Sequence, residues 1–278
     1  MIDTHSHLYD EAFDADRDAA IQRALDAGVD LMILPAIDSQ SHERQERLAE
    51  QHPECFRQMM GLHPTSVNDN FEQELEIVRE KLFSPSSTPP LTHSHTYTLT
   101  HSHTPYVAVG EIGLDLYWDT TYLEQQREVL LRQMLWAEEL NLPVCLHVRK
   151  AYNELFALLK RLNRPTYRGV MHCFGGSLQE AYKAIEMGFC LGVGGVATFK
   201  NATLGTIAAT VPLESLVLET DAPYLAPVPH RGHRNESAYI PLIAAHIAER
   251  RGITLDEVAE TTDHTARKLL ELPEVKRS

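Results

Sequence analysis

Several short apolar runs in this chain are each followed by a histidine, aspartate or glutamate. If the runs are parallel strands closed into a barrel, their carboxyl ends meet at one mouth. Imidazole nitrogens and carboxylate oxygens without a thiolate suit Zn²⁺, Mg²⁺ or Mn²⁺. Because the set exceeds what one tetrahedral ion needs, it predicts two divalent ions. The predicted ligands are His5, His7, Glu111, His147, His172 and Asp221.

No member of this set is convincing alone. Residues i and i+2 of a strand point to the same side, so His5 and His7 could reach one ion. The same HSH string recurs at 93–95 and 101–103, inside two copies of THSHT. Only the first copy follows an apolar strand. Taken singly, His147 or His172 could be a hydrogen-bonded core residue, and their common placement favours ligands.

Two carboxylates have alternative interpretations. Glu111 ends an apolar run, where a charge is costly unless it is paired or metal-bound, so a buried ion pair is the alternative. Glu219 lies two residues before Asp221, on the same side of the strand. It could orient a histidine ligand, assist a general base or form an ion pair at the strand end.

The elements that must position these residues follow a repeating strand-then-helix pattern. It predicts an α/β fold, a TIM (β/α)8 barrel, since the strand candidates are nearly continuous apolar runs. A doubly wound sheet is the alternative, but no GxGxxG follows the first strand. The predicted strands are 1–6, 31–36, 56–62, 106–112, 143–148, 169–173, 189–193 and 216–219. The predicted helices are 14–27, 41–51, 71–82, 121–140, 151–162, 177–187, 203–210, 237–251, 255–262 and 264–270.

We expect one domain over residues 1–278, which suits the length of a single barrel. It is interrupted at 84–105 by a segment rich in Ser, Thr, Pro and His. This composition predicts a flexible insertion, and its position between a helix and a strand places it on the face away from the usual active site.

Composition narrows the class of protein. The hydrophobic content of 43% is ordinary, and no apolar run is long enough to cross a bilayer. The amino terminus does not resemble a signal peptide, and the four cysteines lack CxxC spacing, so we expect free buried thiols and a cytoplasmic location. The net charge of −14 argues against non-specific duplex binding, which depends on Lys and Arg.

Ordered motifs along nearly the whole chain resemble the TatD family of metal-dependent hydrolases. They are DTHSHL at 3–8, GLHP at 61–64, GEIGLD at 110–115, PVCLHVR at 143–149, HCFGG at 172–176, ETDAPYLAP at 219–227 and RGHRN at 231–235. The resemblance implies a TIM barrel of the amidohydrolase type that cleaves phosphodiester bonds as a deoxyribonuclease. DNA, single-stranded or at strand ends, would be the substrate, and the composition permits a monomer.

The resemblance also implies roles for individual residues. His5 and His7 would bind the first ion with Asp221, and Glu111 would bridge to a second ion held by His147 and His172. Asp221 and Glu111 would carry the catalysis, with Asp221 accepting a proton from water. Two further positions, His63 and Arg231, would contact a substrate phosphate, and we add Arg149 from its place after His147.

The sequence departs from the family pattern at two places. Thr65 follows Pro64 where the family often has histidine, and Ser237 stands where a proline is common. Neither position is a predicted ligand, so both bear on substrate preference. Alternatives are a hydrolase of the same fold acting on a small ester, lactone, amide or phosphotriester, and a non-catalytic metal-binding or nucleic-acid-binding protein. The THSHT repeats could also serve metal storage or sensing.

Overall fold

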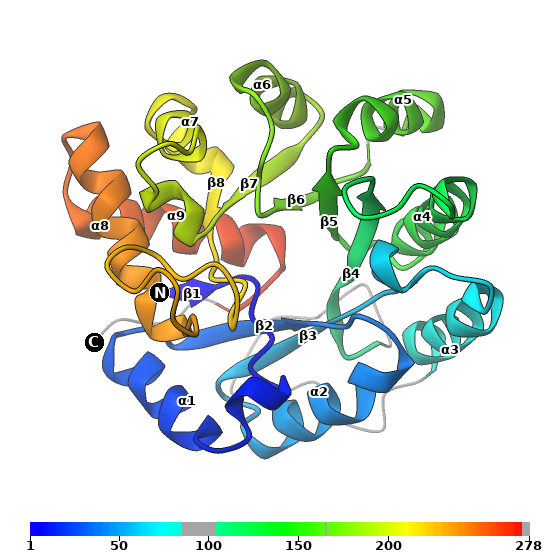
Figure 1. Ribbon diagram of the computed structural model, residues 1–278, viewed down its shortest axis with the longest axis horizontal. Coiled ribbons are helices and arrows are strands. Elements are labelled where there is room, and N and C mark those ends of the chain that lie inside the picture. The colour runs from blue at the N-terminus through cyan, green and yellow to red at the C-terminus, as the bar shows by residue number, and fades with distance from the viewer. Residues whose placement is uncertain (85–103, 165, 274–278) are drawn as a thin grey trace.

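The computed structural model describes residues 1–84, 104–164 and 166–273, in which eight strands form one parallel sheet. Each strand pairs with the next along the chain, so the order is β1 to β8. Figure 1 shows the strands in the centre with the helices around them. The predicted barrel is therefore confirmed. The strands are β1 (Ile2–Asp3), β2 (Leu31–Pro35), β3 (Phe56–Met60), β4 (Tyr106–Asp115), β5 (Val144–Arg149), β6 (Gly169–His172), β7 (Phe189–Val193) and β8 (Leu216–Leu218).

The segments that follow β1 and β8 bring the first and last strands together. The Thr4 amide donates to the Leu218 carbonyl at 2.9 Å, and Ser6 forms a parallel bridge with Ala222. The Asp221 amide donates to the His5 carbonyl at 2.9 Å. These bonds set the first histidine pair beside the last carboxylate, although they are 214 or more residues apart in the chain.

The predicted ends of three strands need correction. Glu111 does not end its strand, because β4 continues to Asp115 and pairs with β5 through Gly113 and Leu114. Gly113 allows the close approach, since a Cβ there would lie 1.9 Å from the His147 carbonyl oxygen. Strands β1 and β8 are shorter than predicted, so the histidine pair and Asp221 follow strand ends instead of lying within them.

The helices cover the outside of the barrel. They are α1 (Arg17–Asp26), α2 (Ser39–Gln51), α3 (Phe71–Phe83), α4 (Leu123–Glu139), α5 (Tyr152–Leu162), α6 (Leu178–Glu186), α7 (Leu204–Thr210), α8 (Ile240–Arg251) and α9 (Leu255–Leu269). Capping residues start several of them. Asp38 and Ser177 each form a capping box, at α2 and α6, and Gly252 ends α8 in the left-handed conformation.

The two short helices predicted at the carboxyl terminus are one continuous helix, α9. The predicted helices 255–262 and 264–270 leave a break at Asp263. The Asp263 carboxylate instead turns inward and accepts a hydrogen bond from the Ile2 amide at 2.8 Å. The Thr262 hydroxyl donates to the Val258 carbonyl one turn earlier, at 2.8 Å. Both polar side chains therefore find partners within a helical backbone.

Two apolar clusters fill the molecule. Strand side chains that point inward, such as Ile33, Met59 and Val217, form one cluster with Ala266 of α9 and with Leu270, which directly follows that helix. The larger cluster lies between the sheet and the surrounding helices. Because side chains of a strand alternate between its faces, each strand contributes to both. The interior is thus closed by apolar packing with α9.

Three expectations from composition have mixed outcomes. No described helix is long and apolar enough to cross a membrane. All four cysteines are free, but only Cys55 and Cys145 are buried, while Cys173 and Cys190 are partly exposed. Most of the predicted insertion, including the histidines of both THSHT repeats, lies outside the described residues.

Candidate metal centre

The other five predicted ligands lie around Glu111, whose side chain is only 3% exposed. Its Oε2 atom lies 3.1 Å from His5 Nε2 and 4.0 Å from His7 Nε2. Its Oε1 atom lies 3.0 Å from His147 Nδ1 and 3.9 Å from His172 Nε2. The two oxygens of one carboxylate therefore face different imidazoles, and His63 also lies beside Oε1.

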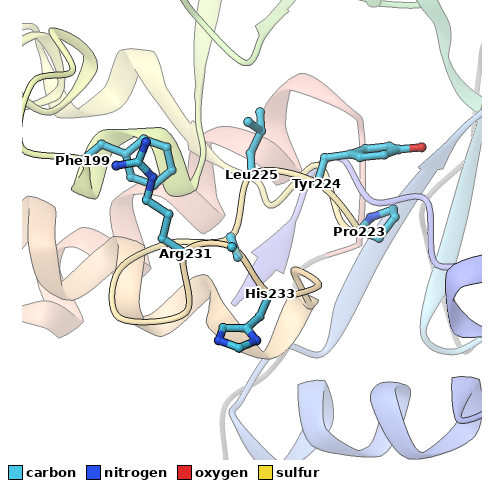
Figure 2. A pocket seen from close by; sticks show the side chains of 8 residues that line it. Phe199, Pro223, Tyr224, Leu225, Arg231 and His233 are labelled. Atoms are coloured by element: carbon cyan, nitrogen blue, oxygen red, sulfur yellow. The ribbon is translucent and has the colours of Figure 1, made fainter.

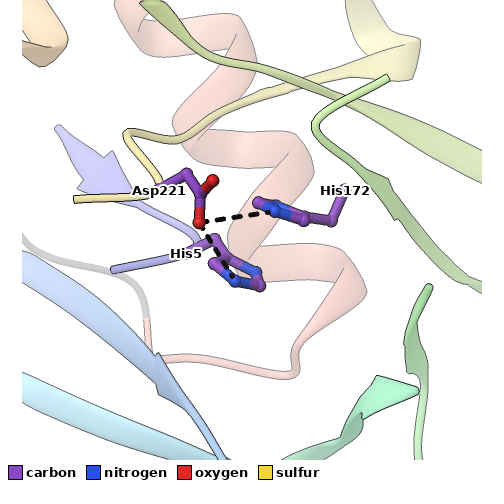
Figure 3. A group of neighbouring side chains, drawn as sticks. All are labelled: His5, His172 and Asp221. Carbon is purple, nitrogen blue, oxygen red and sulfur yellow. Dashed lines mark ion pairs between the residues drawn. The ribbon is translucent and has the colours of Figure 1, made fainter. Parts of the chain in front are cut away.

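Asp221 lies at the open side of the same group. Its Oδ1 atom is 3.5 Å from His7 Nε2, and Figure 3 shows the same oxygen between His172 Nε2 at 3.7 Å and His5 Nε2 at 3.9 Å. The rings of His5 and His172 are stacked, with centroids 3.4 Å apart. His172 thus contacts both halves of the centre, whereas the resemblance placed it with the second ion only.

Hydrogen bonds outside the centre fix which nitrogen of His7 faces inward. Tyr9 donates its hydroxyl proton to the Pro35 carbonyl at 2.7 Å, so it accepts from His7 Nδ1 at 2.8 Å. This assigns the proton of neutral His7 to Nδ1 and leaves Nε2 with a free lone pair. His7 Nε2 lies 3.3 Å from His5 Nε2, so two nitrogens converge where a cation would be favoured.

Glu219 holds His172 in the same way. Its Oε2 atom lies 3.0 Å from His172 Nδ1, and its Oε1 atom accepts from the Cys173 amide at 2.5 Å. Gly192 makes room for this carboxylate, since a Cβ there would lie 2.2 Å from Glu219 Oε2. Of the roles that the sequence left open for Glu219, this geometry supports orientation of a histidine ligand.

Asp115 has a similar position that sequence reasoning missed. Its Oδ2 atom lies 2.8 Å from His147 Nε2, and its Oδ1 atom accepts from the Tyr117 amide at 2.8 Å. The ring of His147 is thereby held between Asp115 and Glu111. A signal was present, because residue 115 lies four positions after Glu111 in one strand and so on the same side. Tyr9 was also missed, although it lies only two residues after His7.

The electrostatics of the centre favour added positive charge. Burial opposes protonation of His172, but the carboxylates of Glu219 and Glu111 outweigh it and raise its pKa to about 10. Burial likewise opposes protonation of His147, yet hydrogen bonds to Asp115 and Glu111 raise its pKa to about 9. Burial and the charge of His172 lower the pKa of His5 to about 4.

The same imidazoles stabilise the carboxylates. Burial would raise the pKa of Glu111, but the positive charge on the surrounding histidines holds it well below its usual value. The pKa of Asp221 is also lowered despite burial, by a hydrogen bond to His7 and by the charges of His172 and His5. Protons therefore concentrate on imidazoles that divalent ions would compete for, and the nitrogen and oxygen donors fit such ions.

Four groups of described residues bring three ligand atoms close enough to hold an ion. They are His5, His172 and Asp221; His5, His7 and Glu111; His63, Glu111 and His147; and His172, Cys173 and Glu219. All six predicted ligands occur in the first three groups. The third group adds His63, which the resemblance made a substrate contact.

His63 lies close to the centre as a hydrogen-bond donor. Its Nε2 atom is 3.3 Å from Glu111 Oε1. Its Nδ1 atom accepts from the Thr65 amide at 3.1 Å, which assigns the proton of neutral His63 to Nε2. Thr65, a departure from the family pattern, also places its hydroxyl 2.7 Å from Nδ1. This arrangement suits a donor toward an anion better than a metal ligand.

The two predicted cations lie at the rim, away from Glu111. The guanidinium of Arg231 lies 4.5 Å from the centre of the Phe199 ring, and both line a cavity of about 490 Å³ with Tyr224 (Figure 2). The ring of Tyr224 is 6.3 Å from that of His7, so the cavity adjoins the centre. The guanidinium of Arg149 lies 3.7 Å from the centre of the Tyr117 ring.

Ser237, the other departure, belongs to a buried network behind the centre. Its hydroxyl donates to Asp3 Oδ2 at 2.6 Å, and the same oxygen accepts from the Thr220 hydroxyl at 2.6 Å. The other oxygen of Asp3 accepts from the amides of His5 at 3.2 Å and Thr220 at 2.9 Å. The network therefore fixes the backbone that precedes both His7 and Asp221.

Comparisons with known proteins agree with this geometry. The family model described as TatD related DNase matches residues 2–271. The chain is 33% identical to the uncharacterized metal-dependent hydrolase YabD of Bacillus subtilis (strain 168), over 98% of this chain and 99% of that protein. It is 30% identical to the 3'-5' ssDNA/RNA exonuclease TatD of Pantoea ananatis (strain LMG 20103), over 98% of this chain and 100% of that protein.

A solved structure agrees as well. The crystal structure of YjjV, a TatD homologue from Escherichia coli K12, matches with a TM-score of 0.86 and 33% identity, and the match covers 98% of each chain. The family model spans nearly the whole chain, and both full-length relatives are at least 30% identical. The chain is therefore a metal-dependent hydrolase that belongs to the family of TatD-related DNases.

Proposed function

We propose that this hydrolase is a deoxyribonuclease that cleaves phosphodiester bonds of single-stranded DNA or strand ends, with two divalent ions per chain. The observation that carries the proposal is the position of Glu111, whose two oxygens face different imidazoles. His5 and His7 lie beside Oε2, and His147, His172 and His63 lie beside Oε1. The relative from Pantoea ananatis, named as an exonuclease on ssDNA and RNA, supports the substrate class.

In this proposal His5, His7 and Asp221 would hold one ion, His147 and His172 would hold the other, and Glu111 would be a ligand of both. His172 lies near enough to both halves to adjust between them. The ions would be Zn²⁺, Mg²⁺ or Mn²⁺, which imidazole and carboxylate donors accept. When bound, such a pair lowers the pKa of water and polarises a phosphoryl oxygen.

The protein's own groups then position the substrate and move the proton. Asp221 is 17% exposed, against 3% for Glu111, so it is the carboxylate open to a water at the mouth and the better general base. His63 donates toward the phosphate from beside Glu111. Arg231 offsets phosphate charge from the cavity beside Tyr224, and Arg149 does so from the other rim.

The proposal is tested with 3′-labelled single-stranded DNA after metal is removed and each ion is restored. We expect metal-dependent release of nucleotides, and Asp221→Asn should lower kcat by about 100-fold or more because the general base is lost. Asp18→Asn is the control, since the Asp18 side chain is 93% exposed. Full activity of a folded Asp221→Asn protein would contradict the mechanism. Faster hydrolysis of a small ester or lactone would contradict the substrate.

Three further expectations belong to the same proposal. We propose a monomer in the cytoplasm, with a single domain that carries an insertion at 84–105. The four free cysteines support a reducing compartment. If the insertion has no part in catalysis, its deletion leaves hydrolysis intact. Loss of activity in a folded deletion variant would instead favour a role for the THSHT repeats.

A further inference from the structure

Two aromatic side chains are exposed at the mouth of the barrel, beside the metal centre. Tyr117 and Trp118 lie two and three residues after the end of β4, in the loop that leads to α4. Tyr117 is 44% exposed and Trp118 is 72% exposed. Their rings meet edge to face with centroids 4.7 Å apart. Adjacent exposed rings at an active-site mouth point to a ligand with flat apolar faces.

Two cations lie on these rings. The Arg149 guanidinium is 3.7 Å from the centre of the Tyr117 ring and 5.3 Å from that of Trp118, and Lys150 Nζ is 4.9 Å from that of Tyr117. Within the described parts of the chain, Arg149 and Lys150 form no ion pair, although the charge of Arg149 also acts on the nearby Asp115 carboxylate. In a chain with a net charge of −14, this leaves both cations available to an external anion.

Asp115 joins these side chains to the metal centre. One oxygen of its carboxylate accepts from the Tyr117 amide at 2.8 Å, and the other lies 2.8 Å from His147 Nε2. A single carboxylate thus fixes both the start of the aromatic loop and an imidazole that faces Glu111. The rings are therefore held at a set place relative to the proposed reaction.

We infer that Tyr117, Trp118, Arg149 and Lys150 form a platform on which an unpaired nucleobase of the substrate stacks while its phosphate meets the two cations. The inference rests on the proposed function and adds the residues that would hold the DNA strand. Stacking on aromatic rings tolerates any base, because every base has a π-face. Both faces of a base inside a duplex are already covered by its neighbours, so the platform selects single strands or frayed ends.

The platform has a counterpart on the opposite side of the mouth. Arg231 follows β8 and Phe199 follows β7, whereas the platform lies at the carboxyl ends of β4 and β5. Since β4 and β8 are four strands apart in the order of an eight-stranded barrel, the metal centre lies between the two sites. A DNA strand that contacts both the platform and the Arg231 and Phe199 pair would carry its phosphodiester backbone across Glu111 and Asp221.

The test is equilibrium binding of a labelled phosphorothioate oligothymidylate, which resists hydrolysis, to the metal-loaded full-length protein. We expect Trp118→Ala to weaken binding about 10-fold, as loss of one stacked base would, and Trp118→Phe to bind within about threefold of the parent. Tyr182→Ala on α6 is the matched control, since Tyr182 is 41% exposed and should bind like the parent. The oligonucleotide should also quench tryptophan fluorescence. The quenching can be assigned to Trp118, because the other tryptophan, Trp136, is only 9% exposed.

An abasic oligonucleotide of the same length separates stacking from charge. With the abasic oligonucleotide, the difference in binding affinity between the parent and Trp118→Ala should disappear. Equal binding of oligothymidylate by both proteins, or a difference that persists on the abasic strand, would overturn the platform. Because binding needs no turnover, these outcomes are independent of hydrolysis. Failure of the parent to cleave labelled DNA would overturn the proposed function. The platform would still be judged by the binding measurements alone.

Discussion

The carboxylate of Glu111 lies where an isolated charge would be strongly destabilising. It is almost fully buried, and a buried charge is tolerated when it is paired and hydrogen-bonded. Here five imidazoles lie within 4.0 Å of it, and despite burial their charges and hydrogen bonds hold its pKa well below the usual range. Replacing these protons with divalent ions would keep the balance of charge, which is why the centre suits metal binding.

Asp115 provides a test of how the ligands are oriented. In Asp115→Asn the amide cannot accept from His147 as a carboxylate does, so the ring loses its fixed orientation. Loss of such a supporting partner typically weakens metal binding about 10- to 100-fold. We expect that change in the dissociation constant for Zn²⁺, measured by competition with a chromogenic chelator.

Asp119→Asn is the control for this variant. Asp119 lies in the loop that follows Asp115, but its carboxylate accepts hydrogen bonds from Thr121 and, among the described residues, from no imidazole. It should leave the dissociation constant within about twofold of the parent, as surface substitutions usually do. Unchanged metal affinity in a folded Asp115→Asn protein would show that the Asp115 contact does not support His147.

Single residues were predictable where their type and their place in the chain agreed. Histidines and acids that follow apolar runs identified all six candidate ligands, which the structure brings together around Glu111. Supporting residues such as Tyr9 and Asp115 were not predicted. Their role depends on which ring nitrogen faces inward, and that is set by side-chain hydrogen bonds between residues whose contact requires the folded barrel.

At the scale of elements, the loop between β8 and α8 is tied to α1. Glu236 accepts from Arg23 at 2.7 Å and from Arg234 at 2.8 Å, and Arg234 also bonds Asp16 at 2.6 Å. The adjacent Asn235 donates to the carbonyls of Thr220 and Tyr224, both at 2.7 Å. These ion pairs therefore help to fix the backbone around Asp221.

The ionisation of Glu236 should make the free energy of unfolding depend on pH. Burial would raise its pKa, but hydrogen bonds from Arg23 and Arg234 lower it below the usual 4.5. The folded protein thus binds this proton less tightly than the unfolded chain, so the contribution to stability is present above about pH 4.5 and is lost as pH falls below it. Glu236→Gln should lower the free energy of unfolding by about 1–2 kcal/mol at pH 7.

The measurement is urea unfolding of the parent and Glu236→Gln from pH 7 to pH 3. The difference between the two proteins should shrink as the parent carboxylate becomes protonated. Glu186→Gln on α6, outside this loop and helix, serves as the control. A difference that stays constant down to pH 3 would contradict the proposed role of the Glu236 charge.

Element order was predictable because each strand is a continuous apolar run and each helix an amphipathic one. The errors have physical causes at particular places. Strand β4 extends beyond its apolar run because Gly113 lets it approach β5 closely. Helix α9 is continuous because Asp263 finds a partner at the Ile2 amide. Neither contact is local, so neither appears in a window of sequence.

At the scale of the whole molecule, the centre joins the first and last strands, so bound metal should stabilise the entire barrel. Its ligands come from residues 5 to 221 and would be far apart in the unfolded chain. Ions at about 100 times their dissociation constant would add roughly 2.7 kcal/mol per independent site. We expect Zn²⁺ or Mn²⁺ to raise Tm by at least about 5 °C over chelator-treated protein in scanning calorimetry. A Tm that does not respond to any divalent ion would contradict metal binding by the folded centre.

The central claim is that Glu111 links two divalent ions, and counting the bound metal tests it most directly. Elemental analysis after equilibrium dialysis against a fixed free-metal concentration should give two ions per chain for the parent and fewer than one for Glu111→Gln. Glu43→Gln, whose side chain is 81% exposed, should keep two. One ion in the parent, or two retained by a folded Glu111→Gln protein, would contradict the account.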